Sequence, residues 1–183
     1  MTAVEVQPEP VLAVRSEVVA LLDELGVRYE VVDGLVVVMP SATAAHEQLA
    51  MWLGAQLLRT ASHDMAVLGS NYNYLYAWPG QAFVNADVVV ARQQDAEPDG
   101  IRVPPLLMVE VLSRSTRRYD ATLKKRIYES HGVPSYWLVD PDEPSLTVLE
   151  LDEAGRYAET ARVSGAEVLR VERPFPVELR LTR

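Results

Sequence analysis

The chain has 183 residues, 49 % hydrophobic and 23 % charged, so one domain with a substantial core is expected over residues 1–183. It contains no cysteine, which excludes disulfides, thiolate nucleophiles and cysteine-ligated metal sites. The net charge of −9 argues against a surface that attracts nucleic acid everywhere, although residues 113–126 concentrate bases.

The first ten residues carry acids and prolines where a secretory signal would carry bases and an apolar core. No later run approaches the roughly 18 apolar residues of a membrane span. We therefore expect a cytoplasmic protein with no membrane partner, and an extended or disordered tail over residues 1–12.

Residues 15–26 place apolar side chains at helical spacing, which predicts a first helix ending at Gly26. Residues 27–40 hold two β-branched runs that meet at Asp33–Gly34. Both residues of this dipeptide can reach positive φ, so a tight hairpin is predicted. A second helix is predicted over residues 42–61, with Ser41 as its N-cap.

Further strands are predicted for residues 65–70, 71–78, 82–91, 106–113 and 135–141, with a turn at Pro79–Gly80 and a polar loop over 92–104. A helix ending near His131 separates the last two of these strands. A second hairpin is predicted over residues 145–160, and one further short strand before Pro174. The helix between two strands suits a crossover, so we predict an α/β fold: a mixed central sheet flanked by helices, with additional hairpins.

Two acids lie inside runs that are apolar at alternate and intervening positions alike, Asp87 in NADVVVA and Glu110 in LLMVEVLS. Such runs are typical of central strands covered on both faces, where an unpaired carboxylate costs several kcal/mol. If the two strands are neighbours, the acids form half of an oxygen-ligand site for Mg²⁺. The alternatives are structural: Asp87 accepts backbone hydrogen bonds at a strand start, and Glu110 forms a buried ion pair with a following arginine.

One lysine of the following helix is expected to face the protein. At about 100° per residue, Lys124 falls inside the inward stripe formed by Leu123, Ile127, Tyr128 and His131. With Asp120 as N-cap, Lys124 would lie near the helix N-terminus, where a cation needs a negative partner such as Glu110 or a bound phosphate. The alternative is a lysine that extends along the apolar face into water.

Several segments resemble the restriction-endonuclease-like proteins of bacteria, a branch of the PD-(D/E)XK nuclease superfamily. These segments are NADVVVA, LLMVEVLSRSTRRYD, LKKRIYESHGVPSYWLVDP and VVDGLVVVMPSATAAHEQL. The resemblance covers roughly residues 27–180, and its most specific part is the spacing from Asp120 through Lys124 and Tyr128 to Gly132. It implies the restriction-endonuclease-like fold.

Carried onto this sequence, the resemblance matches Asp87 to the first acid of the motif and Glu110 to the second. Leu112 stands where the standard motif has its lysine, and Lys124 matches the lysine that this family carries on the helix instead. Ala86 stands where the motif usually has proline, a residue that shapes the strand rather than contacting metal.

The resemblance implies a metal-dependent endonuclease that hydrolyses phosphodiester bonds of DNA. Mg²⁺, or Mn²⁺ as the alternative ion, would be held by Asp87, Glu110 and the carbonyl of Val111, and Lys124 would assist the water or the phosphate. The basic stretch 114–126 would hold the nucleic-acid backbone by charge. A homodimer is expected, because two related sites suit the cutting of two strands.

Two other functions stay open at this point. The first is a noncatalytic binding or regulatory protein that retains the nuclease scaffold, since fold does not determine function. The second is a metal-dependent hydrolase of small phosphoesters.

The remaining candidates favour structural roles. His46 lies at the border of the apolar side of its helix, where a packing histidine is preferred over a site residue, and Glu47 projects toward solvent. No histidine metal cluster is expected, because the other two histidines are separated in sequence: His63 and His131. Three tyrosines alternate along one strand face, which predicts sheet packing or a dimer contact: Tyr72, Tyr74 and Tyr76.

Overall fold

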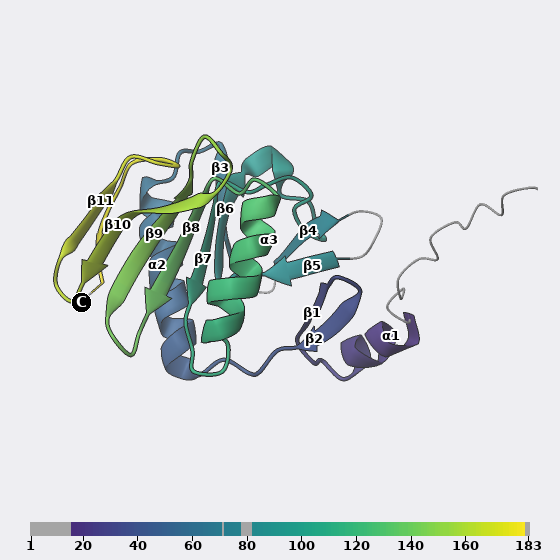
Figure 1. Cartoon of the computed structure of the whole chain (residues 1–183). Helices are drawn as coiled ribbons and strands as arrows, with labels where there is room; N and C mark the ends of the chain where they lie inside the picture. Colours follow the sequence, from purple (N-terminus) through teal and green to yellow (C-terminus); the bar gives the residue numbers. More distant parts are fainter. Residues whose placement is uncertain (1–15, 71, 78–81, 182–183) are drawn as a thin grey trace, which may run out of the picture.

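A computed structural model of the chain describes residues 16–70, 72–77 and 82–181 (Figure 1). The predicted tail over residues 1–12 and the predicted turn at Pro79–Gly80 lie outside these residues. No helix in the described ranges is long and apolar enough to cross a bilayer.

A six-stranded mixed sheet forms the centre of the protein, in the order β10-β9-β8-β7-β6-β3. Its strands are β3 (Met65–Gly69), β6 (Val88–Arg92), β7 (Leu107–Val111), β8 (Ser135–Asp140), β9 (Ser145–Leu151) and β10 (Tyr157–Ser164). The pair β7 and β8 is parallel, and the other neighbouring pairs are antiparallel. The β7–β8 connection is a helical crossover made of η2 (Tyr119–Lys124), a π-helical segment, and α3 (Lys125–Ser130), as the sequence predicts.

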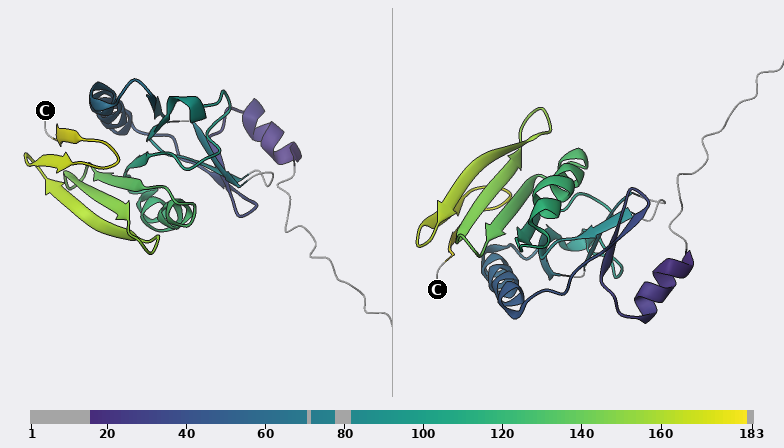
Figure 2. Two further views of the ribbon diagram at one scale, coloured as in Figure 1. Left: turned by 90° about the horizontal axis from the view of Figure 1, so that it is seen from above. Right: turned by 60° about the horizontal axis from the view of Figure 1, so that its bottom comes forward.

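Helices cover both faces of this sheet, with α2 (Ala44–Thr60) on one face and η2–α3 on the other (Figure 2). Successive strand residues therefore enter different cores, because side chains alternate across a strand. Val88 and Val109 pack with Leu53 of α2, whereas Val89 and Met108 pack on the side of α3. This two-sided burial explains why β6 and β7 read as continuous apolar runs.

A second sheet lies beside the first, in the order β2-β1-β5-β4. Its strands are β1 (Tyr29–Val32), β2 (Leu35–Val38), β4 (Asn73–Ala77) and β5 (Ala82–Asn85). The β1–β2 turn confirms the predicted hairpin, with positive φ at both Asp33 and Gly34. The remaining elements are α1 (Ser16–Glu24), η1 (Gln93–Asp95) and the pair β11 (Val168–Val171) and β12 (Val177–Arg180).

The prediction of one strand over residues 82–91 is wrong. The run divides into β5, which pairs with β1 and β4, and β6, which pairs with β3 and β7. Ala86 and Asp87 are the two residues between them, where the chain passes from one sheet to the other. Both halves are largely apolar, since residues 88–91 are buried and β5 is buried at Ala82 and Val84, so the sequence pattern carries no mark of the break.

Two smaller predictions also need correction. The N-cap of α2 is Thr43 rather than Ser41, because the Thr43 side chain accepts a hydrogen bond from the backbone N–H of His46 at 3.2 Å. The C-terminal segment holds two paired strands, β11 and β12, where one strand before Pro174 was predicted. The predicted hairpin over residues 145–160 is confirmed by β9 and β10.

Candidate active site

Asp87 lies at the passage between the two sheets, and its backbone and side chain both bond to β7. Its N–H donates to the carbonyl of Val109 at 3.0 Å, and its Oδ2 accepts from the N–H of Val111 at 2.7 Å. Asp87 and the strand that carries Glu110 are therefore neighbours, as expected, although Asp87 itself lies just before β6. Asp87 also makes the backbone contact that the structural alternative described.

Glu110 lies in β7 on the face covered by η2 and α3, and its side chain is 3 % exposed. Its Oε1 accepts from Lys124 Nζ and from the hydroxyl of Tyr128, each at 3.0 Å. Burial raises the pKa of this carboxyl well above its ordinary value, and the nearby acids add to the effect against the opposing charge of Lys124. Its ion pair is formed with Lys124, not with one of the arginines that follow β7.

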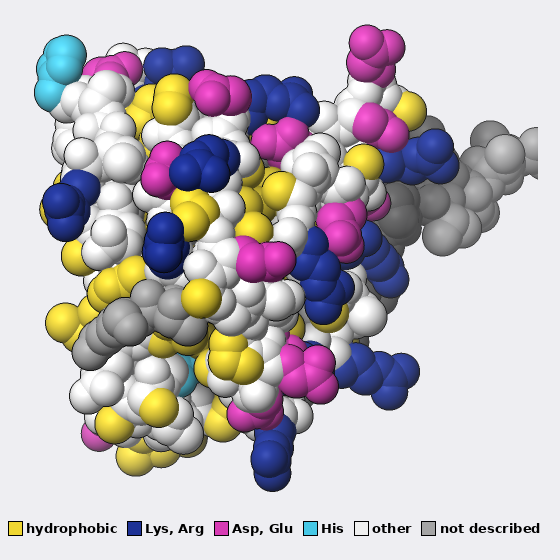
Figure 3. All heavy atoms as spheres, turned by 90° about the vertical axis from the view of Figure 1, so that its left-hand side faces the viewer, with side chains coloured by type: hydrophobic (Ala, Val, Ile, Leu, Met, Phe, Trp, Pro, Cys, Tyr) yellow, Lys and Arg dark blue, Asp and Glu magenta, His cyan; other side chains and the backbone are white. Residues whose placement is uncertain are grey.

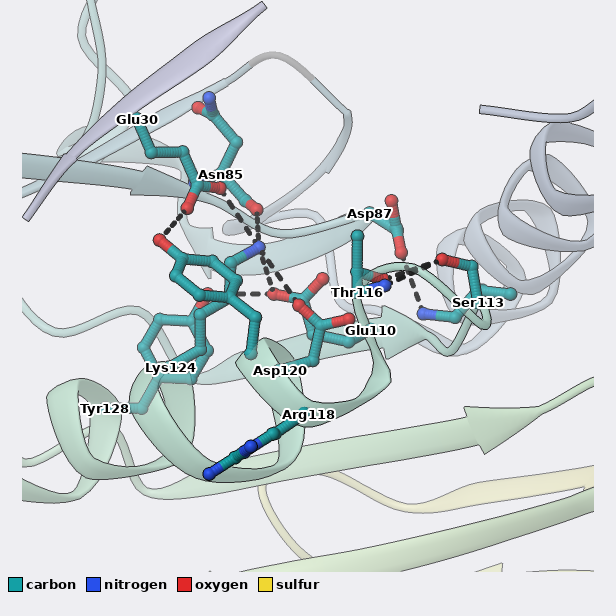
Figure 4. A network of polar contacts seen from close by, with 12 residues as sticks. Glu30, Asn85, Asp87, Glu110, Ser113, Thr116, Arg118, Asp120, Lys124 and Tyr128 are labelled. Atoms are coloured by element: carbon teal, nitrogen blue, oxygen red, sulfur yellow. Dashed lines mark hydrogen bonds and ion pairs between the residues drawn. The ribbon is translucent and has the colours of Figure 1, made fainter. Parts of the chain in front are cut away.

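Lys124 points inward from the end of η2 and meets acids from several elements (Figure 4). Its Nζ lies 3.0 Å from Glu110 Oε1, 3.0 Å from Glu30 Oε1 and 3.6 Å from Asp120 Oδ1, and it donates to the carbonyl of Asn85 at 2.6 Å. Burial alone would lower the pKa of this ammonium, but the carboxylates, foremost Glu110, hold it above its ordinary value. The alternative of a lysine reaching solvent is wrong.

Asp120 is not the N-cap of this helix, because the helical conformation begins before it, at Arg117. Ser113 starts the preceding turn by accepting a side-chain hydrogen bond from Thr116 N and a backbone bond from Arg117 N. Asp120 is instead buried inside the π-helical segment, where burial raises the pKa of its carboxyl. A π turn takes up more residues than an α turn, and such turns recur at functional sites.

Glu30 of β1 belongs to the same cluster and was missed by sequence reasoning. It is 1 % exposed, accepts from Asn85 N at 3.0 Å and accepts from the hydroxyl of Tyr119 at 2.6 Å. The available signal was an acid inside the β-branched run YEVV, the same signal that singled out Glu110. That run was interpreted only as one half of a hairpin.

His46, near the start of α2, reaches the site rather than serving only as a packing residue. Its Nε2 lies 2.8 Å from the carbonyl oxygen of Val111 and 3.2 Å from Asp87 Oδ2. The hydrogen bond with Asp87 raises the pKa of the imidazole, against the opposing effect of burial. Nδ1 is buried with no hydrogen-bond partner in the described part of the chain.

These side chains line one pocket with a volume of about 90 Å³, at the junction of the two sheets and the start of α2. Its lining includes four acids, two cationic side chains and one histidine: Glu30, Asp87, Glu110, Asp120, Arg28, Lys124 and His46. Hydroxyls complete its lining: Ser41, Thr43, Ser113, Ser115 and Thr116. The surplus of carboxylates makes the pocket attractive to a cation.

The donor set fits a hydrated Mg²⁺ ion rather than a metal cage made of protein ligands. Among the described residues, no three His, Asp or Glu side chains gather as a metal cluster. Mg²⁺ is usually bound by one or two carboxylates and keeps several waters. Asp87 Oδ1 and Glu110 Oε2 accept no hydrogen bond from the described residues, so each carboxylate keeps one oxygen for an ion.

The basic stretch does not gather around this pocket as the sequence suggested. Arg117 binds Asp140 at the end of β8 through both terminal nitrogens and lies 3.8 Å from Asp142. Arg118 points away from the acidic cluster (Figure 4). Arg114 is 93 % exposed and lies 3.7 Å from Asp142. Among the residues that line the pocket, Arg28 and Lys124 carry the permanent positive charges, and His46 adds one when its imidazole is protonated.

The other candidates remain outside the pocket. His131 packs its ring against Tyr76 at 4.8 Å and bonds to the carbonyl of Ile127. Tyr74, 2 % exposed, packs near Tyr128 with ring centroids 6.4 Å apart, which is the sheet packing that the alternating tyrosines predicted. Two residues lie away from the site, His63 in the exposed turn after α2 and Tyr72 near Glu97. Glu47 lines a neighbouring groove of α2 and β3, which Asp87 also borders.

Comparisons with known proteins agree with this architecture. The model of the Uma2 family, described as "Putative restriction endonuclease", matches residues 15–183. Among solved structures, the chain resembles the crystal structure of a "putative nuclease belonging to DUF820" from Anabaena variabilis. The two share 18 % identity with a TM-score of 0.66, over 87 % of this chain and 94 % of that chain. A search of curated proteins found no significant match.

The family match spans nearly the whole chain, and the likeness to the solved structure covers 87 % of it. The predicted fold class is therefore confirmed. The chain belongs to the Uma2 family and has a restriction-endonuclease-like α/β fold.

Proposed function

We propose that the protein is a nuclease that hydrolyses phosphodiester bonds of DNA with Mg²⁺ or Mn²⁺. Asp87, Glu110 and the carbonyl of Val111 would hold the ion. The observation that carries the proposal is the convergence of these two acids, one just before β6 and one in the adjoining strand β7, on one pocket that holds more carboxylates than bases. Family membership supports the same conclusion.

The surrounding residues orient the proposed ligands. The N–H of Val111 fixes one oxygen of Asp87, and His46 fixes the carbonyl of Val111 at 2.8 Å. Glu110 is oriented by the hydrogen bonds that its Oε1 accepts from Tyr128 and Lys124. When bound, the ion would supply a water of lowered pKa and neutralise charge on the phosphate. Partners that hold metal ligands in this way tune metal affinity.

The charge of the pocket favours a metal-dependent reaction. A phosphodiester is an anion, and a pocket lined by four acids, two cationic side chains and one histidine repels it unless a bound cation offsets the surplus of acids. Hydroxyls from the Ser113–Thr116 turn and from the segment before α2 lie at the same pocket, where they can donate to phosphate oxygens.

The size of the pocket favours a polymer backbone over a small phosphoester. Sites that enclose whole small molecules usually measure about 300–1,000 Å³. The volume here is about 90 Å³, room for an ion, a few waters and the reacting phosphate. A nucleotide base would have to remain outside, on the surface beside the pocket.

Nucleic acid is not expected to bind over every face. The face at the β10–β11 end shows acidic and basic side chains interleaved, without a continuous basic field (Figure 3). We propose contact from the side of the pocket, with a two-fold homodimer presenting one site to each strand of a duplex. Sedimentation of the free protein and of its DNA mixture tests the dimer.

The direct test is cleavage of plasmid DNA with Mg²⁺ or Mn²⁺ by the unmodified protein and Glu110→Gln. Cleavage should need the ion and disappear in Glu110→Gln. Glu150→Gln is the matched control, since Glu150 is also buried but pairs with Arg173 of the loop after β11. Undiminished cleavage by Glu110→Gln would refute the site assignment. Faster hydrolysis of bis-p-nitrophenyl phosphate than of DNA would favour a phosphoesterase.

A noncatalytic binding protein is the second candidate, favoured by one observation. Lys124 is fully engaged with protein oxygens, so it has no free donor for water or phosphate in this arrangement. Thermal unfolding with Mg²⁺ or Mn²⁺ separates binding from catalysis. A metal-induced rise in Tm without cleavage of any nucleic-acid substrate would favour the noncatalytic function.

A further inference from the structure

The ammonium of Lys124 has three N–H donors, and three protein oxygens lie in hydrogen-bonding range of it. They are the carbonyl of Asn85 at 2.6 Å, Glu30 Oε1 at 3.0 Å and Glu110 Oε1 at 3.0 Å. The side chain is only 3 % exposed. For Lys124 to contact a substrate, one of these bonds has to break.

Glu30 is itself fixed from two sides. Its Oε2 accepts from the Tyr119 hydroxyl at 2.6 Å, and its Oε1 accepts from the N–H of Asn85 at 3.0 Å. The ring of Tyr119 also lies over the ammonium, with its centroid 5.6 Å from Lys124 Nζ. A chain of contacts thus runs from Tyr119 to Glu30 and on through Lys124 to Glu110. Figure 4 shows its part from Glu30 to Glu110.

The two carboxylates approach the ammonium from different sheets. Glu30 belongs to β1 of the four-stranded sheet, whereas Glu110 belongs to β7 of the six-stranded sheet. The ammonium therefore lies between the sheets, and its positive charge is divided between the two acids. Without Glu30, the charge of Lys124 would be drawn to Glu110, where it competes with a bound cation.

We propose that Glu30 is a positioning residue that holds the Lys124 ammonium between the two sheets. Lys124 then acts through Glu110: it orients this carboxylate and offsets part of its negative charge. In this arrangement Lys124 has no N–H donor left for a substrate. The metal-binding part of this inference rests on the proposed function. The anchoring of Lys124 by Glu30 does not, and it is tested separately.

Amine acylation of the full chain tests the anchoring, because the sequence contains only two lysines, Lys124 and Lys125. Lys125 is partly exposed and serves as an internal control in the same peptide. Acetylation with an N-hydroxysuccinimide ester, read by tandem mass spectrometry, should modify Lys125 at least about ten times faster than Lys124. Equal rates in the unmodified protein would overturn the proposal.

Glu30→Gln should raise the Lys124 to Lys125 labelling ratio several-fold, and Glu150→Gln should leave it unchanged. Tyr119→Phe removes only the hydroxyl that fixes Glu30 and changes no charge at neutral pH. It should raise the ratio by a smaller factor, and it keeps the test decisive if Glu30→Gln does not fold. An unchanged ratio in the folded variants would overturn the proposal.

Mn²⁺ binding, measured by electron paramagnetic resonance, tests the consequence for Glu110. Glu30→Gln should weaken binding about three- to tenfold, and Tyr119→Phe should weaken it less. Unaltered affinity in both variants would overturn the claim that Lys124 acts through Glu110. Absence of Mn²⁺ binding in the unmodified protein would refute the proposed function instead, and the labelling ratio would still decide whether Glu30 anchors Lys124.

Discussion

Two groups of ion pairs lie along the helical crossover between β7 and β8, and they differ in the ratio of acids to cations. At the start of the crossover, Arg117 meets Asp140, whose Oδ1 also accepts backbone N–H groups of Asp142 and Glu143. At the end of η2, Lys124 meets more acids than it can neutralise. One cation serves one main acid in the first group, whereas acids are in surplus in the second.

The pKa shifts follow this difference. The guanidinium of Arg117 and the backbone donors lower the pKa of Asp140 to about 2. Burial raises the pKa of Glu110 and of Asp120 despite the nearby ammonium. A carboxylate whose charge is matched by cations and N–H donors stabilises a fold. Several acids gathered in one buried pocket are instead typical of functional sites. The comparison predicts that variants of the two groups fail in different ways.

The largest expected effect is on stability, from Lys124→Met. Removing the cation leaves the buried acids uncompensated, and such a loss costs about 3–5 kcal/mol. Urea unfolding without metal should show this decrease in the free energy of unfolding, and Mg²⁺ should restore part of it. Lys125→Met is the control on the next residue. Stability equal to that of the unmodified protein would mean that the acids do not need Lys124.

The next effect is on metal binding and cleavage, from Asp87→Asn. An asparagine can still accept the hydrogen bond from Val111 N, so the fold should persist. Loss of the charge should lower Mn²⁺ affinity and DNA cleavage by at least about 100-fold, the upper range for residues that only support metal ligands. Titration calorimetry with Mn²⁺ and plasmid cleavage check this. Asp140→Asn should leave both unaffected.

Asp140→Asn should instead lower stability in a pH-dependent way. The pKa of Asp140 is depressed in the folded state from 3.8 to about 2, so its contribution is present above about pH 4 and is lost as the pH falls through 2. Arg117 is 41 % exposed, so solvent screening limits the expected loss at pH 7 to about 1–2 kcal/mol. Urea unfolding measures the free energy of unfolding of the variant and of the unmodified protein. The variant should be less stable at pH 7, and the two values should become nearly equal near pH 2.

The smallest effect is expected from the histidine that orients the Val111 carbonyl. His46→Ala should weaken Mn²⁺ binding about tenfold, the lower range for partners of metal ligands. His46→Gln retains an N–H donor and should recover part of the affinity, whereas His63→Ala should have no effect. Electron paramagnetic resonance measures the Mn²⁺ affinity. If all three variants bind Mn²⁺ as tightly as the unmodified protein does, His46 has no part in metal binding.

The contacts that the sequence did not predict share one property: they join residues that are far apart in the chain. His46 meets Val111 across 65 residues, and Glu30 meets Lys124 across 94, so no local pattern reports either contact. The same holds for Arg117, whose neighbours in sequence suggested a phosphate site but whose partner is Asp140 of β8. A base cluster in sequence becomes a surface patch only if the fold leaves its side chains unpaired.

The sequence by itself determined most local elements and the two acid-bearing apolar runs. Asp33–Gly34 specifies a turn through backbone sterics, and the apolar runs around Asp87 and Glu110 specify strands covered on both faces. Only the tertiary structure decided where the chain passes between sheets at Ala86–Asp87 and how Glu30 reaches Lys124. Steric and hydrophobic preferences act over a few residues, whereas the sharing of one ammonium between two sheets depends on packing that brings distant segments together.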